Sequence, residues 1–200
     1  MATIILAMLV FAVIHSLMAR SGIKTGIRHR INERTYYGLY RLVYNIIAGL
    51  TFVPVLIVAA AAPGPVLWRA DGILFWGLVL IQLIGLIGLI VSLLQIDLGQ
   101  FTGLSQVRAY VSGKPLPLPT EPLQTGGVYR LVRHPLYLFW LMVIWATPLM
   151  TESLLVFNIA VTLYFIIGSR LEERQLVKVF GQPYVEYQQR VPWMIPFLMI

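Results

Sequence analysis

The residues best suited to chemistry lie in two polar clusters that flank a long apolar run. The first polar cluster, residues 125–137, reads TGGVYRLVRHPLY and combines cations, aromatic rings and a His-Pro pair. The second polar cluster, residues 170–174, reads RLEER. Between them, residues 138–168 hold a single charged side chain, Glu152. If this apolar run folds back on itself, the two clusters meet at one face of a membrane.

The first polar cluster is suited to holding an anionic group or a flat ring. Pro135 favours the first turn of a helix because its missing N–H would be unpaired there anyway, and His134 precedes it as the predicted cap. The amides of a helix start attract anions, and Arg133 adds a positive charge. Tyr129 and Tyr137 offer aromatic faces with hydroxyl groups. Basic and aromatic residues also anchor membrane helices at interfaces, so simple anchoring is the alternative interpretation.

The second polar cluster places two adjacent carboxylates, Glu172 and Glu173, directly after an apolar segment. Incomplete solvation there would make a cationic partner stabilising. Arg170 and Arg174 are one candidate for that partner, and the ammonium group of a bound ligand is another. A molecule that carries an ammonium, a carboxylate and an aromatic base would satisfy both clusters, and S-adenosylmethionine is such a molecule.

The composition predicts an integral membrane protein. Of the 200 residues, 58% are hydrophobic and 12% are charged, and the mean hydropathy is +0.81, which is too apolar for a soluble domain of this length. A membrane-spanning helix needs roughly 20 apolar residues. Residues 3–17, 42–62 and 73–94 meet or approach this length. Residues 136–168 exceed it and carry Thr147-Pro148 and Thr151-Glu152-Ser153 near their middle, which predicts a helical hairpin with arms at 136–150 and 153–168.

The expected fold is therefore an all-α integral membrane protein with five transmembrane helices, the last two forming a hairpin, in a single domain of residues 1–200. Two short interfacial helices are expected after Glu173, one on each side of Gly181. His15 and Asn45 are expected to form hydrogen bonds between helices, and Gly77, Gly85 and Gly88 to allow close helix packing.

The distribution of positive charge predicts the orientation. Under the five-span model, Arg69 lies on one side of the membrane and the other 14 of the 15 cations lie on the opposite side. Because cytoplasmic loops accumulate Lys and Arg, the amino terminus is predicted outside the inner membrane and both polar clusters in the cytoplasm. The net charge of +7 then indicates anionic lipids rather than nucleic acid as the partner. The sequence has no cysteine, and its three histidines lie without metal-ligand spacing, so no metal site is expected.

An ordered series of motifs resembles the isoprenylcysteine carboxyl methyltransferase and phospholipid methyltransferase superfamily. It runs through residues 106–196 and consists of Gly127-x-Tyr129, Arg133-His134-Pro135-x-Tyr137, Arg170-x-Glu172-Glu173, Phe180-Gly181-x-x-Tyr184-x-x-Tyr187 and Val191-Pro192. The front half, with His15-Ser16-Leu17 and residues 101–106, is similar to the bacterial branch that contains NnrU-like proteins and methanethiol S-methyltransferases.

This resemblance implies a membrane enzyme whose cytoplasmic side closes over S-adenosylmethionine, in the regions 106–137 and 170–196. It implies that the cofactor is lined by Gln124, Tyr129, His134, Pro135, Leu136, Tyr137 and Glu172, with Glu173 in support and Gln106 as a further candidate. Arg170 is the candidate for attracting an anionic acceptor. One position departs from the family: Phe139 stands where a glycine is common, and its ring bears on helix packing or on a substrate tunnel.

The predicted function is methyl transfer from S-adenosylmethionine to a small or lipophilic acceptor, with a thiol or an isoprenylcysteine-type carboxylate favoured. A sulfonium is already a strong electrophile, so positioning and exclusion of water supply much of the acceleration and no catalytic side chain is assigned. The alternatives are a noncatalytic NnrU-like accessory protein and a small-molecule permease. A permease would more naturally show broken helices or charges at the middle of the membrane.

Overall fold

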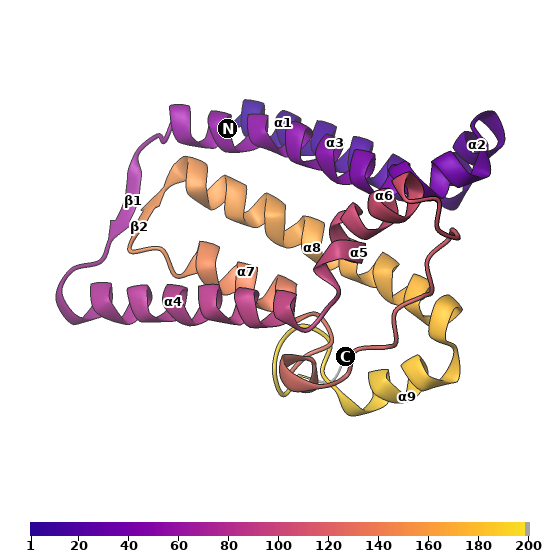
Figure 1. Ribbon diagram of the computed structural model, residues 1–200. Coiled ribbons are helices and arrows are strands. Elements are labelled where there is room, and N and C mark those ends of the chain that lie inside the picture. Colours follow the sequence, from indigo (N-terminus) through magenta and orange to yellow (C-terminus); the bar gives the residue numbers. More distant parts are fainter. Residues whose placement is uncertain (199–200) are drawn as a thin grey trace. The chain divides into compact units, whose positions relative to one another are not determined.

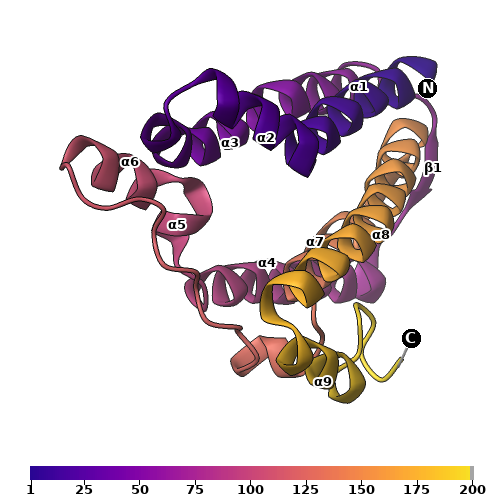
Figure 2. The same cartoon turned by 90° about the vertical axis from the view of Figure 1, so that its right-hand side faces the viewer.

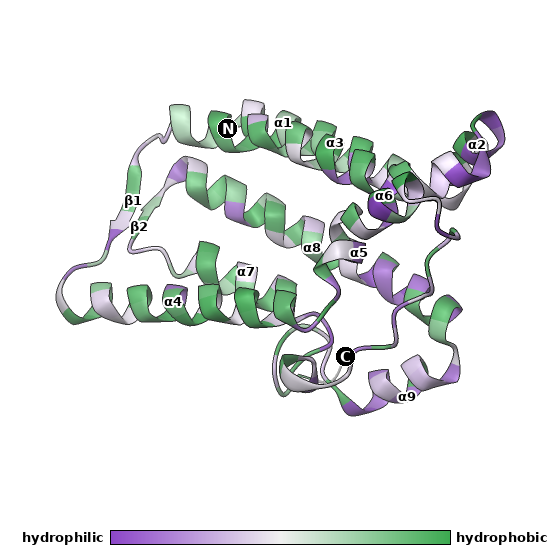
Figure 3. Cartoon of the chain, in the orientation of Figure 1, coloured by the Kyte–Doolittle hydropathy of each residue, from purple (hydrophilic) through white to green (hydrophobic). Residues whose placement is uncertain are grey.

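The computed structural model describes residues 1–198 and is mostly helical. Its internal contacts divide the chain into two compact units. Unit 1 comprises Met1–Ala62 and Asp97–Glu121, and unit 2 comprises Pro63–Ile96 and the described part of Pro122–Ile200. Both units contain long apolar helices, coloured as hydrophobic in Figure 3, and shorter helices with more hydrophilic residues.

Unit 1 is built on two long helices that pack along each other, as Figures 1 and 2 both show for α1 and α3. Its elements are α1 (Ala2–Ala19), α2 (Ser21–Arg30), α3 (Glu33–Ala61), α5 (Leu98–Thr102) and α6 (Leu104–Val111). The second predicted span therefore starts at Glu33, nine residues earlier than expected. The side chain of Asn32 caps this helix by accepting a hydrogen bond from the Arg34 amide, and Glu33 is favourable in its first turn.

Polar side chains join the elements of unit 1 as the sequence predicts. His15 Nε2 on α1 lies 2.5 Å from the Tyr44 hydroxyl on α3. The Asn45 amide donates to the carbonyls of Phe101 and Thr102, at 3.0 and 2.9 Å. The first bond fixes α1 against α3, and the second fixes α3 against the short helix α5.

Unit 2 holds the segments that carry both polar clusters. Its elements are β1 (Val66–Arg69), α4 (Gly72–Leu94), the 3-10 helix η1 (Gly127–Arg130), α7 (Pro135–Trp145), β2 (Leu149–Thr151), α8 (Glu152–Phe180) and α9 (Gln182–Arg190). Pro135 occupies the first turn of α7, as predicted. Figure 1 shows α7 lying along α4.

Among residues 1–198, four helices are long and apolar enough to cross a membrane: α1, α3, α4 and α8. They correspond to four of the five predicted spans. The segment predicted at 136–150 forms α7, which is apolar but has only eleven residues. At about 1.5 Å rise per residue, such a helix is much shorter than the hydrocarbon core.

The prediction of a purely helical chain is wrong in one detail, because unit 2 contains a two-stranded antiparallel pair. Val66 of β1 lies opposite Thr151 of β2, and Arg69 lies opposite Leu149. The carbonyls of Pro63 and Pro65 accept hydrogen bonds from the amides of Ser153 and Glu152. These bonds tie the turn between α7 and α8 to the segment before α4. Strands of three and four residues leave too short a pattern to be recognised in a sequence.

The carboxyl-terminal helices also differ from the prediction. The span expected at 153–168 and the first of the two interfacial helices form one helix, α8, of 29 residues. Residues 169–180 contain neither glycine nor proline, so nothing in the sequence interrupts the helix there. It ends at Gly181, whose φ of +63° lies in the region that favours glycine. The second predicted helix is α9.

Phe139 occupies the space that two glycines leave on α4. A Cβ atom added to Gly88 would meet the Phe139 ring, and one added to Gly85 would lie 3.0 Å from the Phe139 carbonyl oxygen. Phe139 is buried, with 8% of its surface exposed. The expectation that Gly85 and Gly88 permit close packing is confirmed, whereas Gly77 faces open space and the expectation is wrong there.

We expect Gly88→Ala to destabilise the protein by about 1–3 kcal/mol, because the added methyl group overlaps the Phe139 ring in a packed interface. Thermal unfolding of the detergent-purified protein measures this. The matched control is Gly77→Ala, which meets nothing and gains helix propensity. Combining Gly88→Ala with Phe139→Leu should recover part of the loss; equal melting temperatures for Gly88→Ala and Gly77→Ala would contradict this packing.

Candidate functional site

The two polar clusters meet through a buried ion pair in unit 2. Arg133 Nε donates to Glu173 Oε1 at 2.5 Å, and the two side chains are 3% and 7% exposed. Forty residues separate them in the chain. Glu173 also accepts a hydrogen bond from the Gln188 amide at 3.2 Å. A buried carboxylate is tolerated only when its charge and its lone pairs are satisfied in this way.

Arg133 connects the ion pair to the carboxyl-terminal segment. Its Nη1 donates to the carbonyls of Gln188 and Val191, at 2.9 and 2.5 Å. Its own amide donates to the Pro192 carbonyl at 2.8 Å, and the next amide donates to Trp193 at 3.2 Å. These hydrogen bonds of Arg133 are all made to other groups of the protein. Its charge therefore stabilises the site and is not directed toward a ligand.

His134 lies between the two carboxylates of the second polar cluster. Its Nδ1 is 3.6 Å from Glu172 Oε2, and its Nε2 is 3.4 Å from Glu173 Oε1. His134 is the N-cap residue of α7, as predicted, but its side chain forms no capping hydrogen bond. The imidazole is instead turned toward α8.

Glu172 is the carboxylate of the site that faces outward. Its side chain is 47% exposed, compared with 7% for Glu173. The Tyr137 hydroxyl donates to Glu172 Oε2 at 3.0 Å. The Tyr137 ring stacks on His134 with centroids 5.4 Å apart and on Phe165 of α8 at 4.7 Å. Glu172 is therefore held in place while it remains accessible to a cationic ligand.

Arg170 lies on an aromatic ring rather than beside a carboxylate. Its guanidinium carbon is 3.8 Å from the centre of the Trp193 ring, a cation–π arrangement. Within the described part of the chain, the basic side chains within ion-pair distance of Glu172 and Glu173 are Arg133 and His134. The interpretation that Arg170 or Arg174 neutralises the two glutamates is therefore wrong.

The tyrosines of α9 belong to a buried cluster in unit 2. Tyr184, Tyr187 and Val191 are buried together, and Leu176 and Phe180 of α8 pack against them. Burial raises the pKa of the Tyr184 and Tyr187 hydroxyls, so both stay protonated. The Tyr187 hydroxyl donates to the Tyr129 carbonyl at 2.5 Å, which joins α9 to η1.

The other predicted site residues have different surroundings. Pro135 is fully buried, whereas Gln124 and Leu136 are half-buried. Gln95 lies where a side chain on Gly127 would have to go, and its Oε1 accepts a hydrogen bond from the Val128 amide at 3.3 Å. Gln106 belongs to unit 1, where its amide donates to the Gln100 carbonyl at 3.2 Å.

Sequence reasoning assigned no role to Gln188 or Trp193 and named Val191 only as part of a motif, although all three organise the site. Gln188 and Val191 act partly through backbone carbonyls, which no residue type reveals. Trp193 is buried as well. Among the described residues, the Trp193 indole N–H and the Tyr184 hydroxyl are buried without a hydrogen-bond partner. Buried polar groups of this kind commonly bind a ligand or an ordered water.

Comparison with known proteins assigns the family. The family model described as phospholipid methyltransferase matches residues 81–183, just over half of the chain and the part that carries both polar clusters. The chain belongs to the phospholipid methyltransferase family. No solved structure matches the chain.

Named relatives agree with this assignment. The chain is 34% identical over 194 residues to methanethiol S-methyltransferase 2 of Bradyrhizobium diazoefficiens, covering 97% of this chain and 72% of the relative. It is 33% identical over 198 residues to methanethiol S-methyltransferase of Crocosphaera subtropica, covering 94% and 72%. Protein-S-isoprenylcysteine O-methyltransferase B of Arabidopsis thaliana is 39% identical over 79 residues, covering 38% and 40%. The predicted superfamily is confirmed, and so is the prediction that this protein is a methyltransferase.

We expect Arg133→Met to destabilise this methyltransferase by about 3–5 kcal/mol, because it leaves the Glu173 carboxylate buried without its cation. Chemical unfolding in detergent measures the change. Arg190→Gln is the control, since it breaks the exposed pair with Glu186 and should change stability little. The double variant Arg133→Met with Glu173→Leu should be more stable than Arg133→Met alone; a wild-type melting temperature for Arg133→Met would contradict this role of the pair.

Proposed function

We propose that this protein is an integral membrane methyltransferase that uses S-adenosylmethionine and methylates a small or lipophilic acceptor. The observation that carries the proposal is Glu172, a half-exposed carboxylate that contacts Tyr137 and His134 and precedes Glu173 of the buried ion pair. A structural carboxylate would be enclosed as Glu173 is. An accessible one, held in place by its neighbours, suits the ammonium group of a ligand.

The side chains around Glu172 fit the rest of such a ligand. The buried Tyr184 hydroxyl and Trp193 indole N–H, which lack partners among the described residues, are donors suited to a carboxylate or to the nitrogens of an aromatic base. Under this proposal the cofactor is held by Gln124, Tyr129, His134, Pro135, Leu136, Tyr137 and Glu172. Glu173 supports them by fixing Arg133 and His134.

Bound S-adenosylmethionine supplies an electrophilic methyl group on a sulfonium. The protein then has three tasks: to bind, to orient and to exclude water. Glu172 binds the ammonium, Tyr137 orients Glu172 through its hydroxyl, and the stacked rings of His134 and Phe165 fix Tyr137. The apolar surfaces of α7 and α8 reduce the water available to stabilise a charged acceptor before transfer.

We further propose the topology on which this site depends. α7 and α8 form a helical hairpin, with α7 as a short fifth membrane helix whose turn is tied to β1. Asn158 on α8 donates to the Ile144 carbonyl at 2.7 Å, and Trp145 donates to Thr162 at 3.0 Å, which favours this arrangement. The charge distribution favours an inner-membrane protein with its amino terminus outside, its site in the cytoplasm and residues 1–200 acting as one domain.

A thiol is the acceptor that the relatives favour, because two of them are named methanethiol S-methyltransferases. A thiolate or carboxylate acceptor cancels its charge against the sulfonium, and a poorly hydrated site at the membrane edge favours such a reaction. Phe139 fills the space beside Gly88, so the family's glycine-dependent features do not transfer to this chain. Arg170, on the face of Trp193, is the cation that would attract an anionic acceptor.

Calorimetry of the detergent-purified protein with S-adenosylmethionine tests the function. We expect saturable binding, followed by transfer of labelled methyl groups to methanethiol in preference to prenylated cysteine and phosphatidylethanolamine. Absence of binding at millimolar cofactor would leave only a noncatalytic role. Preference for another of the three acceptors would show that the proposed substrate class is wrong, whereas the proposal that the protein is a methyltransferase would stand.

Glu172→Gln should weaken binding of S-adenosylmethionine about 10- to 100-fold, because it removes a charged hydrogen-bond acceptor but little volume. The melting temperature should change little, since Glu172 is half exposed. The control is Glu186→Gln, another exposed glutamate on the carboxyl-terminal part of the chain. An unchanged cofactor affinity in Glu172→Gln would mean that this carboxylate serves only His134 and Tyr137.

A further inference from the structure

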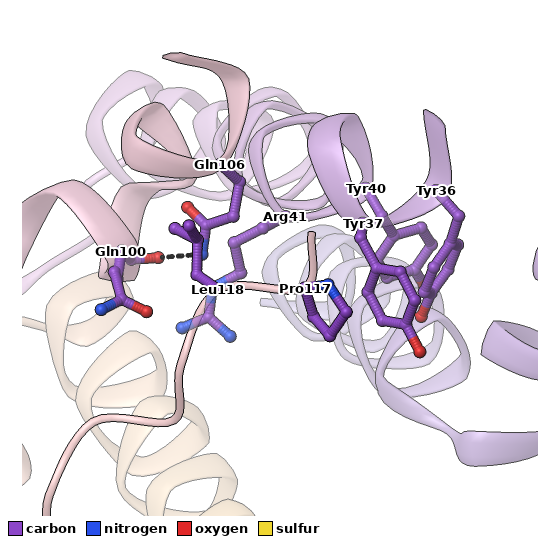
Figure 4. Close-up of a pocket in the computed structure, with 8 residues that line it drawn as sticks. All are labelled: Tyr36, Tyr37, Tyr40, Arg41, Gln100, Gln106, Pro117 and Leu118. Carbon is purple, nitrogen blue, oxygen red and sulfur yellow. Dashed lines mark hydrogen bonds between the residues drawn. The ribbon is translucent and has the colours of Figure 1, made fainter. Parts of the chain in front are cut away.

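A second candidate site lies in unit 1, whereas both polar clusters lie in unit 2. Two adjoining cavities of about 200 and 180 Å³ share Tyr36 and Tyr37 of α3, and we call them together the tyrosine groove. The first cavity is also lined by Tyr40, Arg41, Gln100 and Gln106, and the second by Ser21, Lys24, Thr25 and Arg28. In Figure 4 the three tyrosine rings group on one side of Pro117, and Arg41, Gln100 and Gln106 lie on the other.

The tyrosine groove is positively charged and contains no carboxylate among its lining residues. Arg28 lies 3.7 Å from Glu33 and donates to the Tyr37 hydroxyl at 3.0 Å. Lys24 and Arg41 have no carboxylate within ion-pair distance among the described residues. Burial and the neighbouring charge of Arg41 lower the pKa of Lys24, so a bound anion would relieve an unfavourable environment.

The groove also contains a hydrogen-bond acceptor that no protein group in the described part of the chain donates to. Gln106 Oε1 is buried and has no hydrogen-bond partner in the described part of the chain, although its amide nitrogen donates to the Gln100 carbonyl. A ligand that carries both an anionic phosphate and a hydroxyl donor would satisfy Lys24, Arg41 and Gln106 together. A glycerol phosphodiester has this combination.

The position of the groove favours a lipid as the source of that chemistry. It lies where the polar helix α2 meets the beginning of α3, whose apolar part then crosses the membrane. Beyond the groove, α3 exposes Val43, Ile46 and Leu50 at 45%, 51% and 67%. Acyl chains attached to a headgroup in the groove could lie along this apolar surface. A free phosphate compound would leave it uncovered.

We propose that the tyrosine groove binds the headgroup of an anionic phospholipid, with its phosphate on Lys24 and Arg41 and a headgroup hydroxyl on Gln106. This proposal rests on residues of unit 1 alone and does not depend on the proposed function. An ammonium headgroup would be repelled by the same two cations, so the groove discriminates by charge.

Native mass spectrometry of the detergent-purified protein, titrated with lipid, tests the proposal. We expect phosphatidylglycerol to bind more tightly than phosphatidylcholine. The double variant Lys24→Gln, Arg41→Gln should bind phosphatidylglycerol about 25-fold more weakly, or about fivefold for each charge removed. The control with the same change in net charge is Arg20→Gln, Arg30→Gln, two exposed cations that line neither cavity. Lys24→Gln alone, at a half-buried surface position, replaces the double variant if that variant does not fold.

Two further probes show which parts of the lipid are recognised. Phosphatidylmethanol has the charge of phosphatidylglycerol but no headgroup hydroxyl, so Gln106→Leu should abolish the preference between these two lipids. Glycerol 1-phosphate separates a lipid site from a site for a soluble phosphate. Equal affinity for phosphatidylcholine, unchanged affinity in the Lys24 variants, or binding of glycerol 1-phosphate as tight as that of the lipid would each overturn the proposal.

Discussion

The buried ion pair between Arg133 and Glu173 is the constraint on which the rest of the site depends. Removing two charges from water is costly, and their attraction offsets that cost only when the remaining donors and acceptors are also satisfied. The structure meets this requirement with the carbonyls of Gln188 and Val191, the amide of Gln188 and the imidazole of His134. One ionic contact therefore dictates where the first polar cluster, α8 and the carboxyl-terminal segment lie.

This requirement explains why two adjacent glutamates have different environments. Neighbouring residues on a helix point about 100° apart, so Glu173 can face the interior of unit 2 while Glu172 faces outward. Glu173 gives rigidity, since its contacts hold Arg133 and His134. Glu172 is held in place by His134 and Tyr137, and its side chain remains partly exposed. Preorganisation of this kind lets a binding group act without losing order when a ligand arrives.

Much of the fold could be predicted from the sequence, because the length of an apolar segment can be read from neighbouring residues alone. Residues 73–94 were expected as a helix and form α4 almost to the residue. The partners within the site were harder to predict. Arg170 and Arg174 stand beside the glutamates in sequence, but Arg133, forty residues away, forms the pair. A buried contact is decided by which side chains the packing brings together. The same reasoning applies to Trp193 and to the carbonyls of Gln188 and Val191, whose contacts also depend on the packing.

The pairing of β1 with β2 could not be predicted from the sequence either. β1 and β2 are too short for a recognisable pattern, and their pairing depends on where α4 and α8 begin. The continuity of α8 is the opposite case: the absence of glycine and proline in residues 169–180 was visible in the sequence. The change from apolar to charged residues near Gly168 does not end the helix, because its backbone hydrogen bonds do not depend on whether the side chains are apolar or charged.

The contact of Phe139 with Gly88 has a consequence for how this chain can diverge from its relatives. Where α7 packs along α4, the Phe139 ring fills the space that Gly88 leaves open. A glycine at position 139 would leave a void unless a larger residue replaced Gly88, so the packing is kept only when the two positions change together. Covariation between them among homologous sequences would then mark which helix supplies the bulk in each lineage.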